Sequence, residues 1–155
     1  MMRQKSCFLV GHSDAPESIF HALYAAVEEH IVRYGVAEFI VGHYGSFDKM
    51  AARAIKEAKR SHPEVRLFLL LPYHPAERPI QPSDGFDGTF YPPGMEDVPR
   101  RYAIVRANRY VVEHVDYIIT YACHPASNTQ KLIEYANRRK GCRLLSICNL
   151  GIEGK

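Results

Sequence analysis

Short apolar runs alternate with longer amphipathic stretches along most of this chain. The runs are rich in Val, Ile, Leu and Phe, and several of them close at a glycine or a proline. Near-continuous apolar strands are typical of a parallel sheet that is covered on both faces. The pattern predicts strands at residues 6–10, 38–41, 65–71, 116–121 and 142–147.

The stretches between these runs carry apolar residues at helical spacing. In the first stretch, Leu23, Val27 and Ile31 recur every four residues and therefore share one face of a helix. The same reasoning predicts helices over about residues 15–34, 48–60, 101–113 and 129–139. Strands that alternate with helices imply parallel pairing with right-handed crossovers. We therefore expect an α/β fold, a Rossmann-like three-layer domain with a mostly parallel sheet of about five strands.

One long segment interrupts the alternation. Seven of the ten prolines lie between Pro72 and Pro99, together with three glycines. That density predicts a loop without regular structure over about residues 73–99. A loop of this length is unusual inside a compact domain, so we interpret it as a lid or an insertion.

Length, composition and charge narrow the class of protein. The 155 residues suit a single domain, 1–155, and 46% hydrophobic with 24% charged residues excludes disordered and fibrous classes. The formal net charge is only +3, from 20 basic and 17 acidic residues. The densest basic cluster, 138–140, ends a predicted helix, where it complements the helix dipole. We expect no nucleic-acid partner, because such proteins concentrate Lys and Arg on one face.

The cysteines and the N-terminus indicate a cytoplasmic protein. The four cysteines include no Cys-x-x-Cys pair, and most fall in or beside apolar runs, so we expect free thiols in a reducing compartment. The polar start is followed by only four apolar residues, Cys7–Val10, too few for a signal peptide or a membrane span. We therefore expect a cytoplasmic location and no membrane contact.

Four segments that follow predicted strands hold the residues best suited to bind a ligand. They contain four of the eight histidines, and they are Gly11–Ser13, Gly42–Asp48, Pro72–Pro75 and Tyr121–Thr129. Ligands of open parallel sheets bind beyond the carboxyl ends of the strands. We therefore expect these segments to meet at one edge of the sheet.

The second segment leads from a strand through Gly-His-Tyr-Gly into a helix. Glycines let backbone N–H groups approach an anion, and the helix start adds unpaired donors with a partial positive charge. This pattern predicts a phosphate site formed by Gly42, His43, Tyr44, Gly45, Ser46 and Asp48. The alternative is a plain tight turn in which Ser46 or Asp48 caps the helix.

A second helix begins at Ser127–Thr129, where the polar side chains either bind the same ligand or only cap the helix. The helix before the fourth strand offers four arginines between residues 100 and 109, and spacing does not choose among them. The other predicted ligand-binding residues are Gly11, His12, Ser13, Arg106, Asn108, Ser127, Asn128 and Thr129.

A metal site and a catalytic nucleophile are alternatives with less support. Four histidines on different loops could converge on zinc, although no His-x-His or His-Glu-x-x-His spacing is present. These histidines are His12, His43, His74 and His124. Cys123 and His124 point apart if the segment is extended, which argues against a nucleophile and base pair. No serine lies in a Gly-x-Ser-x-Gly elbow. We expect neither a metal nor a resident cofactor.

The ordered set of these segments resembles the SLOG superfamily, the group around the YpsA-type proteins, DprA and the LOG-type cytokinin-activating enzymes. The resemblance spans nearly the whole chain and rests on Val10–Ser13, Phe39–Asp48, Leu71–Tyr73, Arg106–Val112 with Asp116, and Ser127–Thr129 before Ile133–Ala136. It implies a Rossmann-like fold and a nucleotide-derived ligand at the strand edge. By position it points to Gly11, Gly42, Gly45, Asp48, Arg106, Asn108 and Thr129.

The chain departs from that pattern in three places. Ser13 stands where members carry arginine, His43 stands where they carry a second glycine, and Ser127-Asn128 replaces Gly-Gly. The Pro-Gly-Gly-x-Gly-Thr-x-x-Glu signature of the LOG-type phosphoribohydrolases is also absent. These departures argue against the hydrolase activity, but not against ligand binding.

Three functions follow, in this order, and whether the chain is an enzyme is left open. The first is a module that binds or senses a nucleotide or a nucleotide-derived small molecule. The second is a LOG-like hydrolase of an N-glycosidic bond, which needs a carboxylate such as Asp48, Asp116 or Glu134. The third is an accessory protein in DNA processing, which the small net charge opposes. Homo-oligomers are common among such folds, although the sequence identifies no interface.

Overall fold

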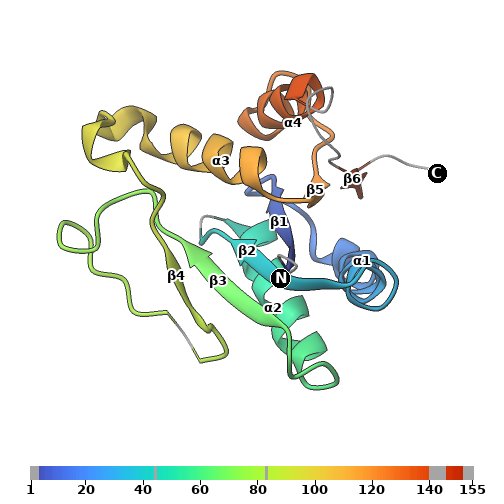
Figure 1. The fold of residues 1–155 in the computed structure, drawn as a ribbon. Helices are drawn as coiled ribbons and strands as arrows, with labels where there is room; N and C mark the ends of the chain where they lie inside the picture. The colour runs from blue at the N-terminus through green and yellow to red at the C-terminus, as the bar shows by residue number, and fades with distance from the viewer. Residues whose placement is uncertain (1–3, 44, 83, 140–145, 152–155) are drawn as a thin grey trace.

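A six-stranded parallel sheet forms the middle layer of the computed structural model, which describes residues 4–43, 45–82, 84–139 and 146–151 (Figure 1). The strands are β1 (Lys5–Gly11), β2 (Val36–Val41), β3 (Arg66–Leu70), β4 (Gly88–Phe90), β5 (Tyr117–Tyr121) and β6 (Ser146–Asn149). Their order is β4-β3-β2-β1-β5-β6, and every neighbouring pair is parallel. The α/β, Rossmann-like prediction is confirmed.

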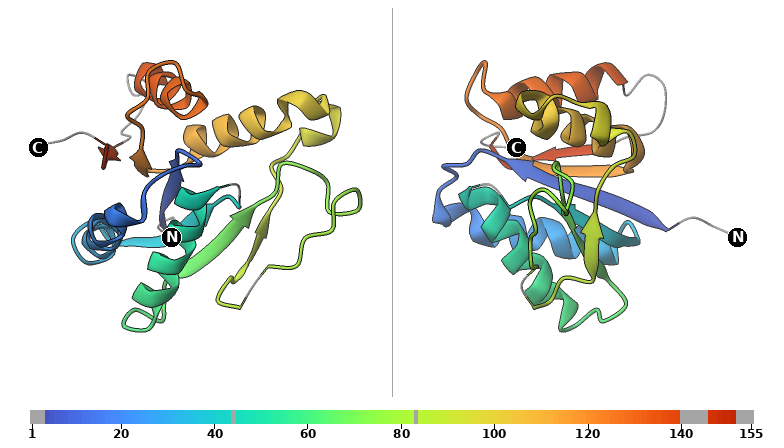
Figure 2. Two further views of the ribbon diagram at one scale, coloured as in Figure 1. Left: turned by 180° about the vertical axis from the view of Figure 1, so that it is seen from behind. Right: turned by 90° about the vertical axis from the view of Figure 1, so that its left-hand side faces the viewer.

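Helices cover both faces of the sheet (Figure 2). They are α1 (Phe20–Val32), which a 3₁₀ turn at Glu17–Ile19 precedes, α2 (Ser46–Lys59), α3 (Ala103–His114) and α4 (Asn128–Arg139). The α1 and α2 pair packs with Leu9 and Phe39 on one face, and the α3 and α4 pair packs with Phe8 and Ile118 on the other. Neither face of the central strands meets water, which explains their near-continuous apolar sequence.

The prediction that residues 73–99 lack regular structure is wrong for part of that segment. The strand β4 lies in a proline-free window and pairs with β3. Two 3₁₀ turns follow, at Met95–Asp97 and at Arg100–Tyr102, so α3 begins at Ala103, two residues later than predicted. The sheet therefore has six strands, one more than the five expected.

Contacts between distant residues hold β4 in place. The carboxylate of Asp87, just before the strand, accepts the backbone N–H of Leu67 at 2.8 Å and pairs with the Nζ of Lys59 at 2.6 Å. The Nζ of Lys59 also donates to the carbonyl of Gly85 at 3.0 Å. The partners of Asp87 lie 20 and 28 residues away along the chain. Local periodicity carries no trace of such contacts, and a three-residue strand has almost no pattern of its own.

The last strand lies later than predicted. We expected it at 142–147, whereas β6 begins at Ser146, and residues 142–145 lie outside the described residues. At its end, the Oδ1 of Asn149 accepts the N–H of Ala122 at 3.1 Å, and its Nδ2 donates to the carbonyl of Ala122 at 3.0 Å. This amide pairing fixes the start of the loop that follows β5. Among the described helices, none is long and apolar enough to cross a membrane.

Candidate functional site

A cavity of about 520 Å³ lies at the carboxyl edge of the sheet, a volume typical of small-molecule sites. The segments after β1, β2, β3 and β5 contribute to it, and α3 and the start of α4 form its walls. The predicted ligand-binding residues that line this cavity are Gly11, His12, Ser13, Gly42, Asp48, Asn108, Ser127, Asn128 and Thr129. The structure thus brings the predicted strand-end segments together.

Four described residues from the same prediction do not line the cavity: His43, Gly45, Ser46 and Arg106. Tyr44 lies outside the described residues. Three of the four belong to the Gly-His-Tyr-Gly segment, which was the expected phosphate loop. The geometry therefore moves the centre of the site from the start of α2 toward the start of α4.

Gly45 and Ser46 fasten two loops to each other. Gly45 has a φ of +105°, and a Cβ at this position would lie 2.5 Å from the Cα of Ser13. The next residue, Ser46, donates its N–H to the carbonyl of Ser13 at 2.8 Å and its hydroxyl to the carbonyl of Ala15 at 2.6 Å. The glycine is required for this close backbone approach, which is the tight-turn alternative considered above.

The buried carboxylate of Asp48 faces the cavity from the first turn of α2. A Cβ on Gly42 would lie 2.9 Å from its Oδ2, so this glycine leaves room for the acid. A carboxylate near a helix N-terminus is stabilised by the helix dipole. Asp48 therefore gives one wall of the cavity a fixed acidic group.

The first turn of α4 presents unpaired backbone donors to the cavity. The Oγ of Ser127 accepts the N–H of Gln130 at 3.1 Å, so Ser127 caps the helix as one of the two predicted alternatives holds. Among the described residues, the N–H groups of Asn128 and Thr129 have no acceptor, and both residues line the cavity. Such a helix start attracts an anion through these donors and through the helix dipole.

Two cations on the cavity wall have no acidic partner. Arg109 and Lys131 line the cavity from α3 and α4, and neither forms an ion pair within the described part of the chain. The guanidinium of Arg109 lies over the ring of Tyr135, 4.7 Å from its centroid. Arg53 and Lys59, by contrast, both pair with carboxylates elsewhere on the surface.

Sequence reasoning did not select these two cations, and it placed weight on Arg106 instead. Arg109 was one of four arginines between which spacing did not decide. Helix geometry separates them, because residues 104, 105, 108 and 109 share one face of α3 at i, i+1, i+4 and i+5 spacing, and Arg106 lies off that face. The signal in the sequence was the apolar pair Ile104 and Val105. These side chains are 38% and 43% exposed and line the cavity.

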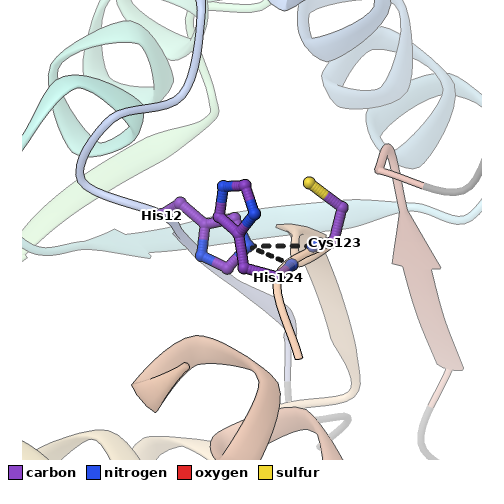
Figure 3. Close-up of side chains that lie close together, drawn as sticks. All are labelled: His12, Cys123 and His124. Carbon is purple, nitrogen blue, oxygen red and sulfur yellow. Dashed lines mark hydrogen bonds between the residues drawn. The ribbon is translucent and has the colours of Figure 1, made fainter. Parts of the chain in front are cut away.

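A buried histidine joins the loop after β1 to the loop after β5 (Figure 3). His12 is 5% exposed, and its Nε2 accepts the backbone N–H groups of Cys123 at 2.8 Å and His124 at 3.1 Å. Its ring stacks on that of His124, with centroids 4.3 Å apart. Burial lowers the pKa of His12 below its ordinary value, and the neighbouring His124 acts in the same direction.

The four strand-end histidines do not all converge as a zinc site would require. His74 is exposed and its Nδ1 accepts the N–H of Ala76 at 2.9 Å. Instead, His12, Cys123 and His124 place one potential ligand atom each within 4.8 Å of one another. The Nε2 lone pair of His12 is already occupied by two amide protons, so this nitrogen has nothing left to offer a metal as folded.

Comparisons with known proteins identify the fold. No protein-family model and no curated protein matches the chain. A molybdenum cofactor binding protein from the phototrophic bacterium Rippkaea orientalis has a similar structure, with a TM-score of 0.60 at 16% identity, over 90% of this chain and 74% of that one. A Moco carrier protein from Chlamydomonas reinhardtii gives 0.59 at 15% identity, over 98% and 79%. A second structure of the Chlamydomonas protein gives 0.57 at 14% identity, over 97% and 77%. At such identities the likeness establishes a shared fold.

Proposed function

We propose that this chain binds a small molecule that joins a flat heterocycle to a phosphate, and that the molybdenum cofactor is the first candidate. One observation carries the proposal: Arg109, Lys131 and the two unpaired N–H groups of α4 face a single cavity. Cations that lack an acidic partner and a helix start together favour an anion, and each charge-assisted hydrogen bond adds both affinity and orientation.

The rest of the cavity suits a ring. Ile104, Val105 and Leu132 give it an apolar wall, and Asp48 supplies a carboxylate that can accept hydrogen bonds from ring N–H groups. The molybdenum cofactor carries a pterin and a phosphate, and a mononucleotide has the same two parts. Because the structural neighbours carry the molybdenum cofactor in their names, that compound precedes the nucleotides as a candidate.

The proposal keeps the SLOG-type expectation of a nucleotide-derived ligand but assigns the phosphate to a different helix. The segment from Gly42 to Ser46 mainly holds the loops together, as Gly45 and Ser46 show. The start of α4 has free donors and a nearby lysine. We therefore place the phosphate at α4 and the ring toward α3 and Asp48.

The hydrolase alternative retains one of its three candidate carboxylates. Asp48 lines the cavity, whereas Glu134 does not. The Oδ2 of Asp116 accepts the N–H of Ser6 at 3.0 Å, near the opposite end of the sheet. A single carboxylate is enough for acid–base chemistry, so the test of binding must also detect turnover. No feature of the described residues favours the DNA-processing alternative.

A thermal-shift screen with mass spectrometry tests this function. The panel is the molybdenum cofactor, GMP, AMP and the two corresponding nucleosides. A ligand at one hundred times its dissociation constant adds about 2.7 kcal/mol of stability, which raises the Tm by several degrees in a domain of this size. We expect a shift with phosphate-bearing compounds, a smaller one with the nucleosides, and unchanged ligand masses. Equal shifts with and without phosphate would contradict the anion assignment, and a cleaved nucleotide would establish the hydrolase instead.

A further inference from the structure

The junction of His12, Cys123 and His124 fixes the position of one proton. Two backbone N–H groups point at the Nε2 of His12, and a backbone amide can only donate. The Nε2 must therefore carry a lone pair. In a neutral imidazole the proton then resides on Nδ1, so the protein sets the tautomer through its own backbone.

The surroundings of the ring also oppose a second proton. The His124 ring stacks on it at 4.3 Å, the Tyr121 ring meets it edge-on at 5.7 Å, and His12 is 5% exposed. The carboxylate of Asp14 acts the other way, but it is exposed and lies 3.8 Å from His124. A proton on Nε2 would also displace both amide donors. The ring therefore stays neutral at the pH of a cell.

The Nδ1–H group is directed to the cavity. Within the described residues no protein acceptor bonds to this nitrogen, and it is not sealed in the protein interior. His12 itself lines the cavity. We propose that His12 is a fixed, neutral hydrogen-bond donor that recognises an acceptor oxygen of the bound ligand. The ligand half of this inference rests on the proposed function, whereas the tautomer belongs to the free protein.

The same geometry decides between this role and a metal site. The three potential ligand atoms lie within 4.8 Å of one another, a spacing that a zinc ion can span. Zinc at the Nε2 of His12 would break two amide hydrogen bonds and leave two buried donors unpaired, which is costly. The amides are held by the chain itself, so the junction favours the hydrogen-bonded arrangement.

The tautomer is tested by two-bond ¹⁵N–¹H NMR of the free protein, with the His12 signals assigned from the spectrum of His12→Gln. We expect a protonated Nδ1 and an unprotonated Nε2, unchanged from pH 8 to pH 5.5 and after addition of one equivalent of zinc. A protonated Nε2, titration of the ring near its ordinary pKa, or a zinc-induced shift of His12 would each overturn the assignment.

The donor role is tested with two substitutions that divide the functions of the ring. His12→Gln places an oxygen where Nε2 accepts the amides but has no donor at the Nδ1 position. His12→Asn places a donor at the Nδ1 position but loses the acceptor. With the molybdenum cofactor and GMP as probes, we expect His12→Gln to keep its unfolding midpoint and to bind about tenfold more weakly. His12→Asn should unfold more easily and retain more of the affinity.

Unchanged binding of both probes by His12→Gln would overturn the donor role. This outcome is distinct from a failure of the proposed function, in which the wild-type chain binds neither probe and the ligand half of the inference fails with it. The NMR experiment decides the tautomer in either case, because it needs no ligand.

Discussion

At the scale of single residues, backbone geometry explains several polar and small residues that the sequence presents as ligand contacts. Gly45 allows a close approach to Ser13, Ser46 bonds to the loop after β1, and Ser127 caps α4. Each of these residue types suits both a turn and an anion site, so sequence alone left both alternatives open. The structure shows that turn chemistry accounts for Gly45 and Ser46.

Gly45→Ala tests this interpretation. The substitution forces a side chain into a left-handed conformation and against the Cα of Ser13, so we expect a loss of roughly 1–3 kcal/mol in the free energy of unfolding. Gly94→Ala is the matched control, because Gly94 also has a positive φ, +81°, but nothing lies within 4 Å of its missing Cβ. Urea unfolding should show the larger loss at position 45. Equal losses would show that contact with Ser13 is unimportant.

At the scale of elements, the predictions succeeded where the pattern is long and local. The strands β1, β2, β3 and β5 and all four predicted helices are present, because each buries an apolar face that repeats at its own period. The short strand β4 escaped detection because its pairing depends on Asp87 and Lys59, far apart in sequence. The cavity wall was found only in part, since which face of α3 meets the cavity is set by packing against α4.

At the scale of the whole molecule, three histidines make stability depend on pH. Burial lowers the pKa of His12, His30 and His43 below the ordinary value of 6.5. His30 is the clearest case, with 2% exposure and an Nδ1 that lies 2.7 Å from the carbonyl of Ala26. A buried base with a lowered pKa binds fewer protons folded than unfolded, so its contribution is complete above pH 6.5 and is lost as the pH falls below it.

We therefore expect a constant free energy of unfolding from pH 7 to pH 8 and a decrease from about pH 6.5 downward. Denaturant titrations at half-unit pH steps would measure it. His30→Phe removes one of the three titrating groups and fills the same apolar space, so its curve should fall less steeply than that of the wild type. A wild-type stability that does not change between pH 7 and pH 5 would contradict this account.

The central claim is that one cavity at the carboxyl edge binds a phosphate through α3 and α4. The most direct measurement is the Kd of GMP and of the molybdenum cofactor, by calorimetry, for the wild type, Arg109→Gln and Arg106→Gln. Both arginines lie on α3 without an ion pair within the described residues, but only Arg109 lines the cavity. We predict about tenfold weaker binding for Arg109→Gln, the loss of one charged hydrogen bond, and a Kd within about twofold of wild type for Arg106→Gln. Equal Kd values for the two variants, or no binding by the wild type, would contradict the account.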